Sequence, residues 1–257
     1  MALFTDGPLN GTLDFQNYEN GILQVVSTEQ IDLAGKAVLA QGEIASELML
    51  FLVRRYRQAD FPWLASVRQA IDLSDVVVTH PLRRWHAHKT LALVYRDAYN
   101  NQLNDRYLGK RREYEQLAKH SQQTYFQIGV GLVSGPIAKP KPPTLTAVSG
   151  PGSAGTYYVE VAWVNDAGQV GSPSDASQLT TLTGQQLRVA TASPPANATG
   201  WNVYVGQSPE TTTLQNVGPI PLNSTWTLTA ALQQGKLPDD GQQPVWFLRD
   251  QRLIERG

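Results

Sequence analysis

The chain has 257 residues, of which 41% are apolar and 17% are charged, and its formal net charge is −1. This composition is typical of a globular protein, and the length favours two domains. The near-zero net charge gives no bulk attraction to nucleic acid. The absence of cysteine excludes disulfides and thiolate metal sites. The longest apolar run, Leu48 to Val53, is too short to span a membrane.

The first 128 residues predict an α-helical domain. The segment 1–26 is punctuated by Gly, Asn and Asp, and it predicts an extended arm or an edge strand. Ser27 and Gln30 have the spacing of a capping box, so we expect a helix to begin there and to end near Arg57. The residues expected on the buried face of this helix are Ile31, Ala34, Val38, Ile44, Leu48, Phe51 and Leu52.

The segment 79–127 is the longest periodic stretch of the sequence, and Thr79 or His80 can cap its start. Aromatic residues recur in it at three- and four-residue spacing, before and after a group of asparagines that ends at Asn104. Because asparagine side chains compete with the helical backbone, this pattern predicts two helices joined by a hairpin or a bend. A shorter helix is expected before them, over 64–71.

The composition changes after Gln127, where the chain loses charge and gains Gly and Pro. Seven short stretches of alternating polar and apolar residues then follow, with turn signals between them, and they predict an antiparallel β-sandwich of immunoglobulin or fibronectin III type. Trp163 and Trp201 are expected in its core. The expected fold class is therefore α+β with several domains: 1–128 helical, 129–143 linker, 144–240 β-sandwich, and 241–257 an extended C-terminal tail.

Charge is unevenly distributed along the chain. Residues 1–53 hold seven acidic residues against Lys36 alone, whereas 83–119 hold nine basic residues against four acidic ones. Two interpretations remain open: these charges lie on solvated helix faces or pair within one chain, or the acidic face of one copy meets the basic face of a neighbouring copy. The candidate inter-subunit residues are Glu29, Asp32, Glu43, Glu47, Arg83, Arg84, Arg111 and Arg112.

A search for catalytic, cofactor-binding and metal-binding residues finds no motif in a supporting context. The glycines from Gly150 to Gly155 match a dinucleotide-binding pattern, but a strand pattern follows them instead of a helix, so they predict a hairpin turn. His86 and His88 lie two positions apart on a helix and point away from each other, which favours a capping or surface role over a metal site. No catalytic residue and no cofactor is predicted, and we expect no enzyme.

Several segments together carry a resemblance to a known family. They are MALFTDGPLNG, EIASELMLFLVRR, DVVVTHPLRRWHAHKTLALVYRDAYN, DRYLGKRREYEQLAKHSQQTYFQIGVGLV, GTYYVEVAWVNDAGQVGSPS and GWNVYVGQSP. In this combination the chain resembles head–tail connector (adaptor) proteins of tailed double-stranded DNA bacteriophages that carry an immunoglobulin-like domain. The resemblance implies a ring of twelve copies between the portal protein and the tail tube or nozzle protein of the virion, assembled in the host cytoplasm. It also implies that genome DNA passes through the lumen without sequence-specific binding.

The C-terminal tail is the candidate element for docking on the portal protein, because it interleaves large apolar residues with arginines. The candidate docking residues are Trp246, Phe247, Leu248, Arg249, Arg252, Leu253 and Ile254. Alternatively, the tail folds back on the helical domain of its own chain. A different class of function, a carbohydrate- or receptor-binding virion module, would need exposed aromatic residues in one patch of the β-sandwich.

Overall fold

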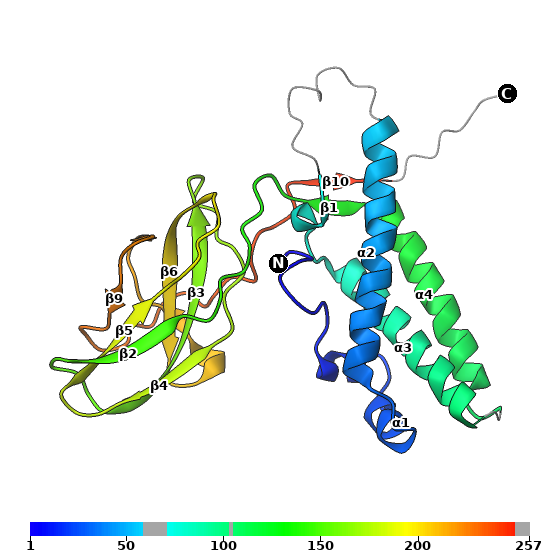
Figure 1. Cartoon of the computed structure of the whole chain (residues 1–257), viewed down its shortest axis with the longest axis horizontal. Coiled ribbons are helices and arrows are strands. Elements are labelled where there is room, and N and C mark those ends of the chain that lie inside the picture. Colours follow the sequence, from blue (N-terminus) through cyan, green and yellow to red (C-terminus); the bar gives the residue numbers. More distant parts are fainter. Residues whose placement is uncertain (59–70, 103–104, 250–257) are drawn as a thin grey trace. The chain divides into compact units, whose positions relative to one another are not determined.

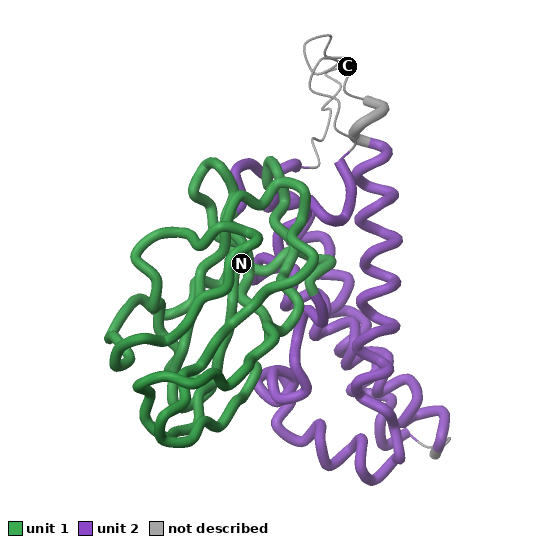
Figure 2. The backbone as a smooth tube through the Cα atoms, turned by 60° about the vertical axis from the view of Figure 1, so that its left-hand side comes forward, with its two compact units in different colours: residues 1–6, 133–243 green, residues 7–132, 244–257 purple. Residues whose placement is uncertain are grey.

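A computed structural model describes residues 1–58, 71–102 and 105–249 of the chain. It contains helices and antiparallel β-sheets, in agreement with the expected α+β class. The chain forms two compact units (Figure 2). Unit 1 comprises Met1–Asp6 and Val133–Gln243, and unit 2 comprises Gly7–Leu132 and the chain from Pro244 onward. Segments from both ends of the sequence therefore belong to each unit, in contrast to the expected boundaries after residues 128, 143 and 240.

The described part of unit 2 is mainly helical (Figure 1). Its helices are α1 (Ile22–Thr28), α2 (Leu33–Gln58), α3 (His80–Gln102) and α4 (Leu108–Ile128). The helices α3 and α4 run antiparallel and meet along their aromatic stripes: Trp85 lies 5.7 Å from Tyr125, and Tyr95 stacks on Tyr114 with ring centroids 5.4 Å apart. The predicted pair of helices is thereby confirmed. The shorter helix expected over 64–71 falls almost entirely outside the described residues.

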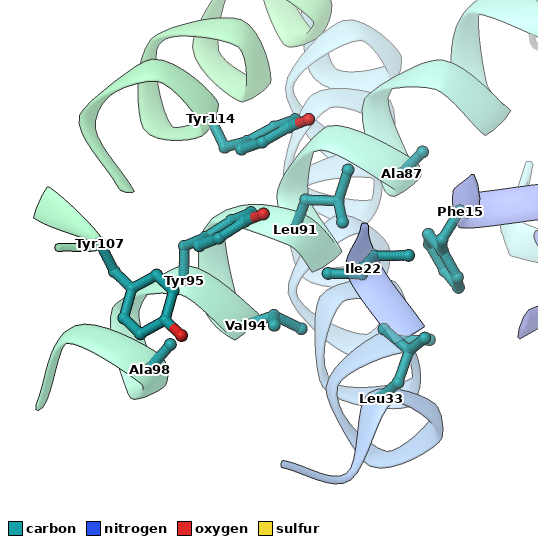
Figure 3. Packing of buried hydrophobic residues seen from close by; sticks show 11 residues of the cluster. Phe15, Ile22, Leu33, Ala87, Leu91, Val94, Tyr95, Ala98, Tyr107 and Tyr114 are labelled. Carbon is teal, nitrogen blue, oxygen red and sulfur yellow. The ribbon is translucent and has the colours of Figure 1, made fainter. Parts of the chain in front are cut away.

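The N-terminal segment is not the extended arm or edge strand that its sequence predicts. It forms a 3₁₀ helix, η1 (Thr12–Asn17), and then α1. Figure 3 shows Ile22 at the centre of a buried cluster, with Phe15 on one side and Leu91 of α3 on the other. The apolar residues of α1 favour strands by intrinsic propensity, but they also recur at helical spacing, and burial against α3 decides between the two.

The start and the buried face of α2 also differ from the prediction. Ser27 lies inside α1 and does not cap α2. Instead, Asp32, the residue just before α2, accepts a hydrogen bond from the backbone N–H of Gly35 at 3.0 Å and so caps the start of the helix. Ile44 is fully buried, as expected. Val38 was expected on the same face but is 70% exposed, since it lies about 120° around the helix from Ile44.

Unit 1 contains two antiparallel sheets. One sheet has the strand order β4 (Ser177–Thr181), β3 (Gly155–Asn165), β6 (Ala198–Gly206) and β7 (Thr213–Leu214), with β8 (Ile220–Pro221) also paired to β6. The other has the order β2 (Thr144–Ser149), β5 (Gln185–Ala190) and β9 (Trp226–Thr227). Because β2 pairs with β5 and not with β3, the glycine-rich segment before β3 connects the two sheets and is not the predicted hairpin turn.

Both sheets contribute side chains to one hydrophobic core. Trp163 of β3 and Trp201 of β6 are directly opposed across the strand pair and are 1% and 0% exposed, which confirms their predicted place in the core. Leu187 of β5 packs in the same cluster. So does Ile137, whose backbone N–H donates to the side-chain oxygen of Gln242 at 2.7 Å. The segment expected to be a linker therefore supplies a core residue of unit 1.

A short two-stranded sheet in unit 2 ties the end of the described chain to the helices. Its strands are β1 (Val130–Leu132) and β10 (Trp246–Leu248), which pair antiparallel. On the other side of β1, the backbone N–H of Val77 donates to the carbonyl oxygen of Gly131 at 2.9 Å. The first part of the expected tail is thus held by backbone pairing within its own chain.

We expect Trp201→Ala to destabilise unit 1 by about 3–5 kcal/mol, because it leaves a large cavity in the core. The core clusters of the two units share no residue, so α3 and α4 should keep their stability. Hydrogen–deuterium exchange in mild urea measures both: amides of β3 and β6 should exchange faster, with α3 and α4 unchanged. Leu182→Ala, at a side chain that is 66% exposed, is the control. Equal acceleration in both units would contradict separate cores.

Candidate interaction surfaces

A half-buried carboxylate fixes the N-terminal segment of unit 2 to α4. The Oε2 atom of Glu19 accepts hydrogen bonds from the Lys110 ammonium at 2.8 Å and from the Tyr114 hydroxyl at 2.9 Å. Burial alone would raise the pKa of Glu19, but these two donors outweigh it and hold that pKa below its ordinary value. Burial and the same carboxylate raise the pKa of Tyr114. Glu19 and Lys110 therefore form an ion pair with each other within one chain.

The acidic flank of α2 pairs with α3 in the same way. The Lys89 ammonium lies 2.8 Å from Glu47 and 3.0 Å from Glu43. Burial opposes the charged form of Lys89, but the two carboxylates outweigh it and raise its pKa. Gln122 of α4 also donates a hydrogen bond to Glu47. Sequence analysis missed Lys89 as a partner, although a lone charge within an aromatic stripe is a signal that it faces other elements.

The candidate inter-subunit residues separate into two groups. Glu29 is 6% exposed and accepts a hydrogen bond from the Tyr107 hydroxyl at 2.9 Å, and Arg111 pairs with Glu115 at 2.9 Å. With Glu43, Glu47 and the capping residue Asp32, these side chains have partners inside the chain. A second group has exposed guanidinium groups and no ion pair to another described residue; it consists of Arg83, Arg84 and Arg112. The structure does not bring the acidic candidates to the basic ones.

Two of the three histidines of α3, His86 and His88, are buried, so the surface role expected for them is wrong. His86 is 0% exposed, and its Nε2 lies 3.0 Å from the carbonyl oxygen of Ala37, while its Nδ1 lies 2.9 Å from the Asn10 amide nitrogen. His88 lies 2.8 Å from the Ser121 hydroxyl. The rings point apart, as predicted, but each meets a different neighbouring element. Among the described residues, no group of three or more His, Asp or Glu side chains is placed to hold a metal ion.

The tail residues keep their apolar side chains partly exposed while their backbone is anchored. In β10, Trp246 is 38% exposed and Phe247 is 47% exposed, and the preceding Val245 is 59% exposed; we call these three residues the β10 patch. Leu248 is half-buried. The Arg249 guanidinium donates to the carbonyl oxygen of Ile128 at 3.1 Å. The other candidate docking residues, Arg252, Leu253 and Ile254, lie outside the described residues.

A second apolar surface of unit 2 was not anticipated. Opposite its buried side, α2 exposes large apolar side chains, which we call the α2 stripe: Val38 (70%), Leu39 (45%), Met49 (38%), Leu50 (53%) and Val53 (42%). Sequence analysis assigned one apolar face to this helix and overlooked that apolar residues outnumber the positions of a single face. Exposed apolar residues are ordinary when scattered, but a row of them along one helix marks an interaction surface.

The described clefts do not resemble a catalytic site. One of about 260 Å³ lies among α2, α3 and α4, but its carboxylates already have partners: Glu43 and Glu47 pair with Lys89, and Glu115 pairs with Arg111. Another of about 180 Å³ in unit 1 is lined by Tyr157, Gln185 and several leucine and alanine side chains. Neither cleft presents an unpaired acid beside a base among its described lining residues, which leaves the two exposed apolar surfaces as the candidate functional features.

Comparison with known proteins assigns no family to the chain. A scan against protein-family models found no match, and a search of the curated proteins found none either. Within the described residues, no helix has both the length and the apolar character needed to cross a membrane. The functional argument therefore rests on the residues and surfaces described above.

Because His86 is buried, we expect unit 2 to lose stability in mild acid. Burial lowers the pKa of His86 in the folded chain, so the unfolded chain binds the proton more readily. Stability should therefore be constant above about pH 6.5 and fall below it, by up to about 1.4 kcal/mol per pH unit for this group. Urea unfolding at a series of pH values measures the slope.

The variant His86→Gln should reduce that slope, whereas the control His80→Gln, at an exposed position, should leave it unchanged. Equal slopes in the wild type and in His86→Gln would show that protonation of His86 does not oppose folding.

Proposed function

We propose that this chain is a structural head–tail connector (adaptor) protein of a tailed bacteriophage. In this proposal copies of the chain form a ring between the portal protein and the tail tube or nozzle protein, and genome DNA passes through the ring without sequence-specific binding. The protein acts through surfaces and catalyses no reaction. The resemblance of its sequence segments to this family implies twelve copies and a location at the head–tail interface of the virion.

The observation that carries the proposal is the exposed apolar surface of unit 2. Its two parts, the α2 stripe and the β10 patch, lie on a unit in which the partly buried charges Glu19, Glu47 and Lys89 already have partners within the chain. Large exposed apolar side chains with polar surroundings are typical of surfaces that meet other proteins. A connector needs such surfaces toward its neighbours in the ring and toward the portal, and it needs no catalytic cleft.

We further infer that unit 1 is an immunoglobulin-like β-sandwich. Support comes from its two antiparallel sheets and from the single core to which both contribute, centred on Trp163 and Trp201. The same burial weakens the alternative of a carbohydrate-binding module. Stacking on a sugar needs exposed aromatic faces, and these two tryptophans are 1% and 0% exposed.

The β10 patch suits docking on the portal protein because its backbone is already ordered. The pairing of β10 with β1 fixes Trp246 and Phe247 before any partner binds, so little conformational entropy is lost when they are covered. Arg249 lies beside them, is exposed, and can add charge-assisted contacts at the rim. Aromatic residues and arginine are the commonest hot spots of protein interfaces.

The variant Trp246→Ser with Phe247→Ser should weaken binding to the portal protein by at least about 30-fold, the effect of losing a hot spot of about 2 kcal/mol. Both side chains are partly exposed, so the melting temperature should change little. Surface plasmon resonance on immobilised portal protein measures the affinity, and Val217→Ser, at a fully exposed residue of unit 1, is the control. Unchanged affinity would refute the docking role.

The variant Arg83→Glu with Arg84→Glu should weaken ring assembly on the portal, because both arginines are exposed and lack an ion pair to another described residue. Circular dichroism should show unchanged helical content. A charge-matched control is Lys141→Glu with Arg188→Glu, two exposed positions in unit 1. Rings that form equally well in both double variants would mean that Arg83 and Arg84 only face solvent.

A further inference from the structure

The helix α2 is apolar on two opposite sides. One side is buried in unit 2 through residues that include Ile44 and Leu48, and the other carries the α2 stripe. The outward positions have the three- and four-residue spacing of a coiled-coil seam. These positions are Gly35, Leu39, Gly42, Ser46, Met49 and Val53, with Val38 and Leu50 beside them.

The residues in the middle of the seam, Gly42 and Ser46, are small, and there is free space in front of Gly42. A side chain placed at Gly42 would meet no atom within 4 Å. The hydroxyl of Ser46 donates to the carbonyl oxygen of Gly42 at 3.1 Å, so its hydrogen-bonding capacity is used within the helix. Small residues between larger apolar ones let a second helix approach closely. The outward face of α2 is therefore shaped to receive another helix.

We propose that the free protein forms a two-fold dimer in which the α2 helices of two copies pack antiparallel through this seam. With the two-fold axis at Ile44, Leu39 of one copy lies level with Met49 of the other, and Val38 lies level with Leu50. Gly42 then lies level with Ser46, where the two helices approach most closely. Large apolar residues therefore meet on both sides of the centre, small ones meet in the middle, and Val53 of each copy lies level with Gly35 of the other at the outer ends. The interface is self-complementary, as a two-fold contact requires.

The observations favour a second copy of α2 over other helices as the occupant. Among the described residues of α3 and α4, the only large apolar side chain that is more than a third exposed is Ile128. The charge beside the seam also permits a pair: Glu43 flanks its centre and lies 3.0 Å from Lys89 of the same chain, which it shares with Glu47. The carboxylate at this point therefore already has a partner within its own chain when two copies approach.

The dimer should be weak and exchangeable. The 26 residues of α2 span about 39 Å, and a strip about 10 Å wide along them covers about 400 Å² on each copy. Stable interfaces usually bury about 800 Å² on each partner. This inference goes beyond the proposed ring, because a two-fold contact joins copies in pairs and does not close a ring of many subunits. The pair covers the stripe in the free protein and can dissociate when a copy joins an assembly.

Sedimentation velocity on the full-length protein tests the dimer without any partner. The wild type should shift from monomer to dimer as its concentration rises through the micromolar range. Leu39→Glu with Leu50→Glu should raise the dissociation constant at least tenfold, whereas Leu13→Glu, at a side chain that is 71% exposed elsewhere in unit 2, should behave as the wild type. A monomer at every concentration, or an equal effect of both variants, would overturn the proposal.

Cross-linking tests the register of the two helices. Because the chain has no cysteine of its own, only the introduced cysteines can form disulfides. An oxidised mixture of Leu39→Cys and Met49→Cys proteins should give a disulfide-linked pair of the two variants, whereas neither variant should link efficiently to itself. Self-linking of each variant would indicate parallel helices. In the double variant Leu39→Cys with Met49→Cys, disulfide ladders beyond two copies would indicate a head-to-tail contact. The absence of any cross-link would mean that the α2 stripe is covered by other residues of its own chain or remains exposed to solvent. Each of these three results contradicts the proposed pair.

Discussion

The antiparallel contact of α3 and α4 is the constraint on which the described part of unit 2 depends. Trp85 packs against Tyr125 and Tyr95 against Tyr114, so the two helices share an aromatic seam. The remaining faces of α3 then hold the other elements. His86 contacts the carbonyl oxygen of Ala37 in α2, while the buried cluster around α3 includes Phe15 and Ile22 from the N-terminal segment. Each of these contacts therefore depends on the position of α3.

The same arrangement determines which charges remain for partners. Lys89 projects from α3 toward α2 and binds Glu43 and Glu47, and Lys36 of α2 forms an ion pair with Asp97 of α3. Part of the acidic excess of the N-terminal residues is balanced in this way, by the positive charge that Lys89 supplies from α3. The described part of unit 2 presents outward two apolar surfaces, the α2 stripe and the β10 patch. It also presents Arg83, Arg84 and Arg112, which form no ion pair with another described residue. That surface fits a protein that works by assembly.

The sequence predicted the elements whose pattern is local and strong. The helices α3 and α4, most strands of unit 1 and the buried Trp163 and Trp201 follow from periodicity alone. The errors arose where tertiary contacts decide. The apolar residues of α1 fit a strand or a helix until α3 covers them, and which apolar side of α2 is buried depends on its packing against α3. The anchoring of β10 by β1 joins residues far apart in sequence, which local patterns do not encode.

The candidate site was predictable in composition but not in arrangement. Trp246 and Phe247 could be selected from the sequence as adhesive residues, and the structure places them partly exposed on a paired strand. Charge counts could not distinguish pairing within a chain from pairing between chains, because both give the same sequence asymmetry. The opposed apolar faces of α2 became visible only when burial had been assigned residue by residue.

The central claim is that the chain is an assembly protein that joins a portal to a tail. Electron microscopy of the purified full-length protein mixed with the portal protein of the same phage tests it most directly. The account predicts a ring of copies seated coaxially on the portal, with an open lumen. Portal particles that remain bare at saturating concentrations of a folded protein would contradict it.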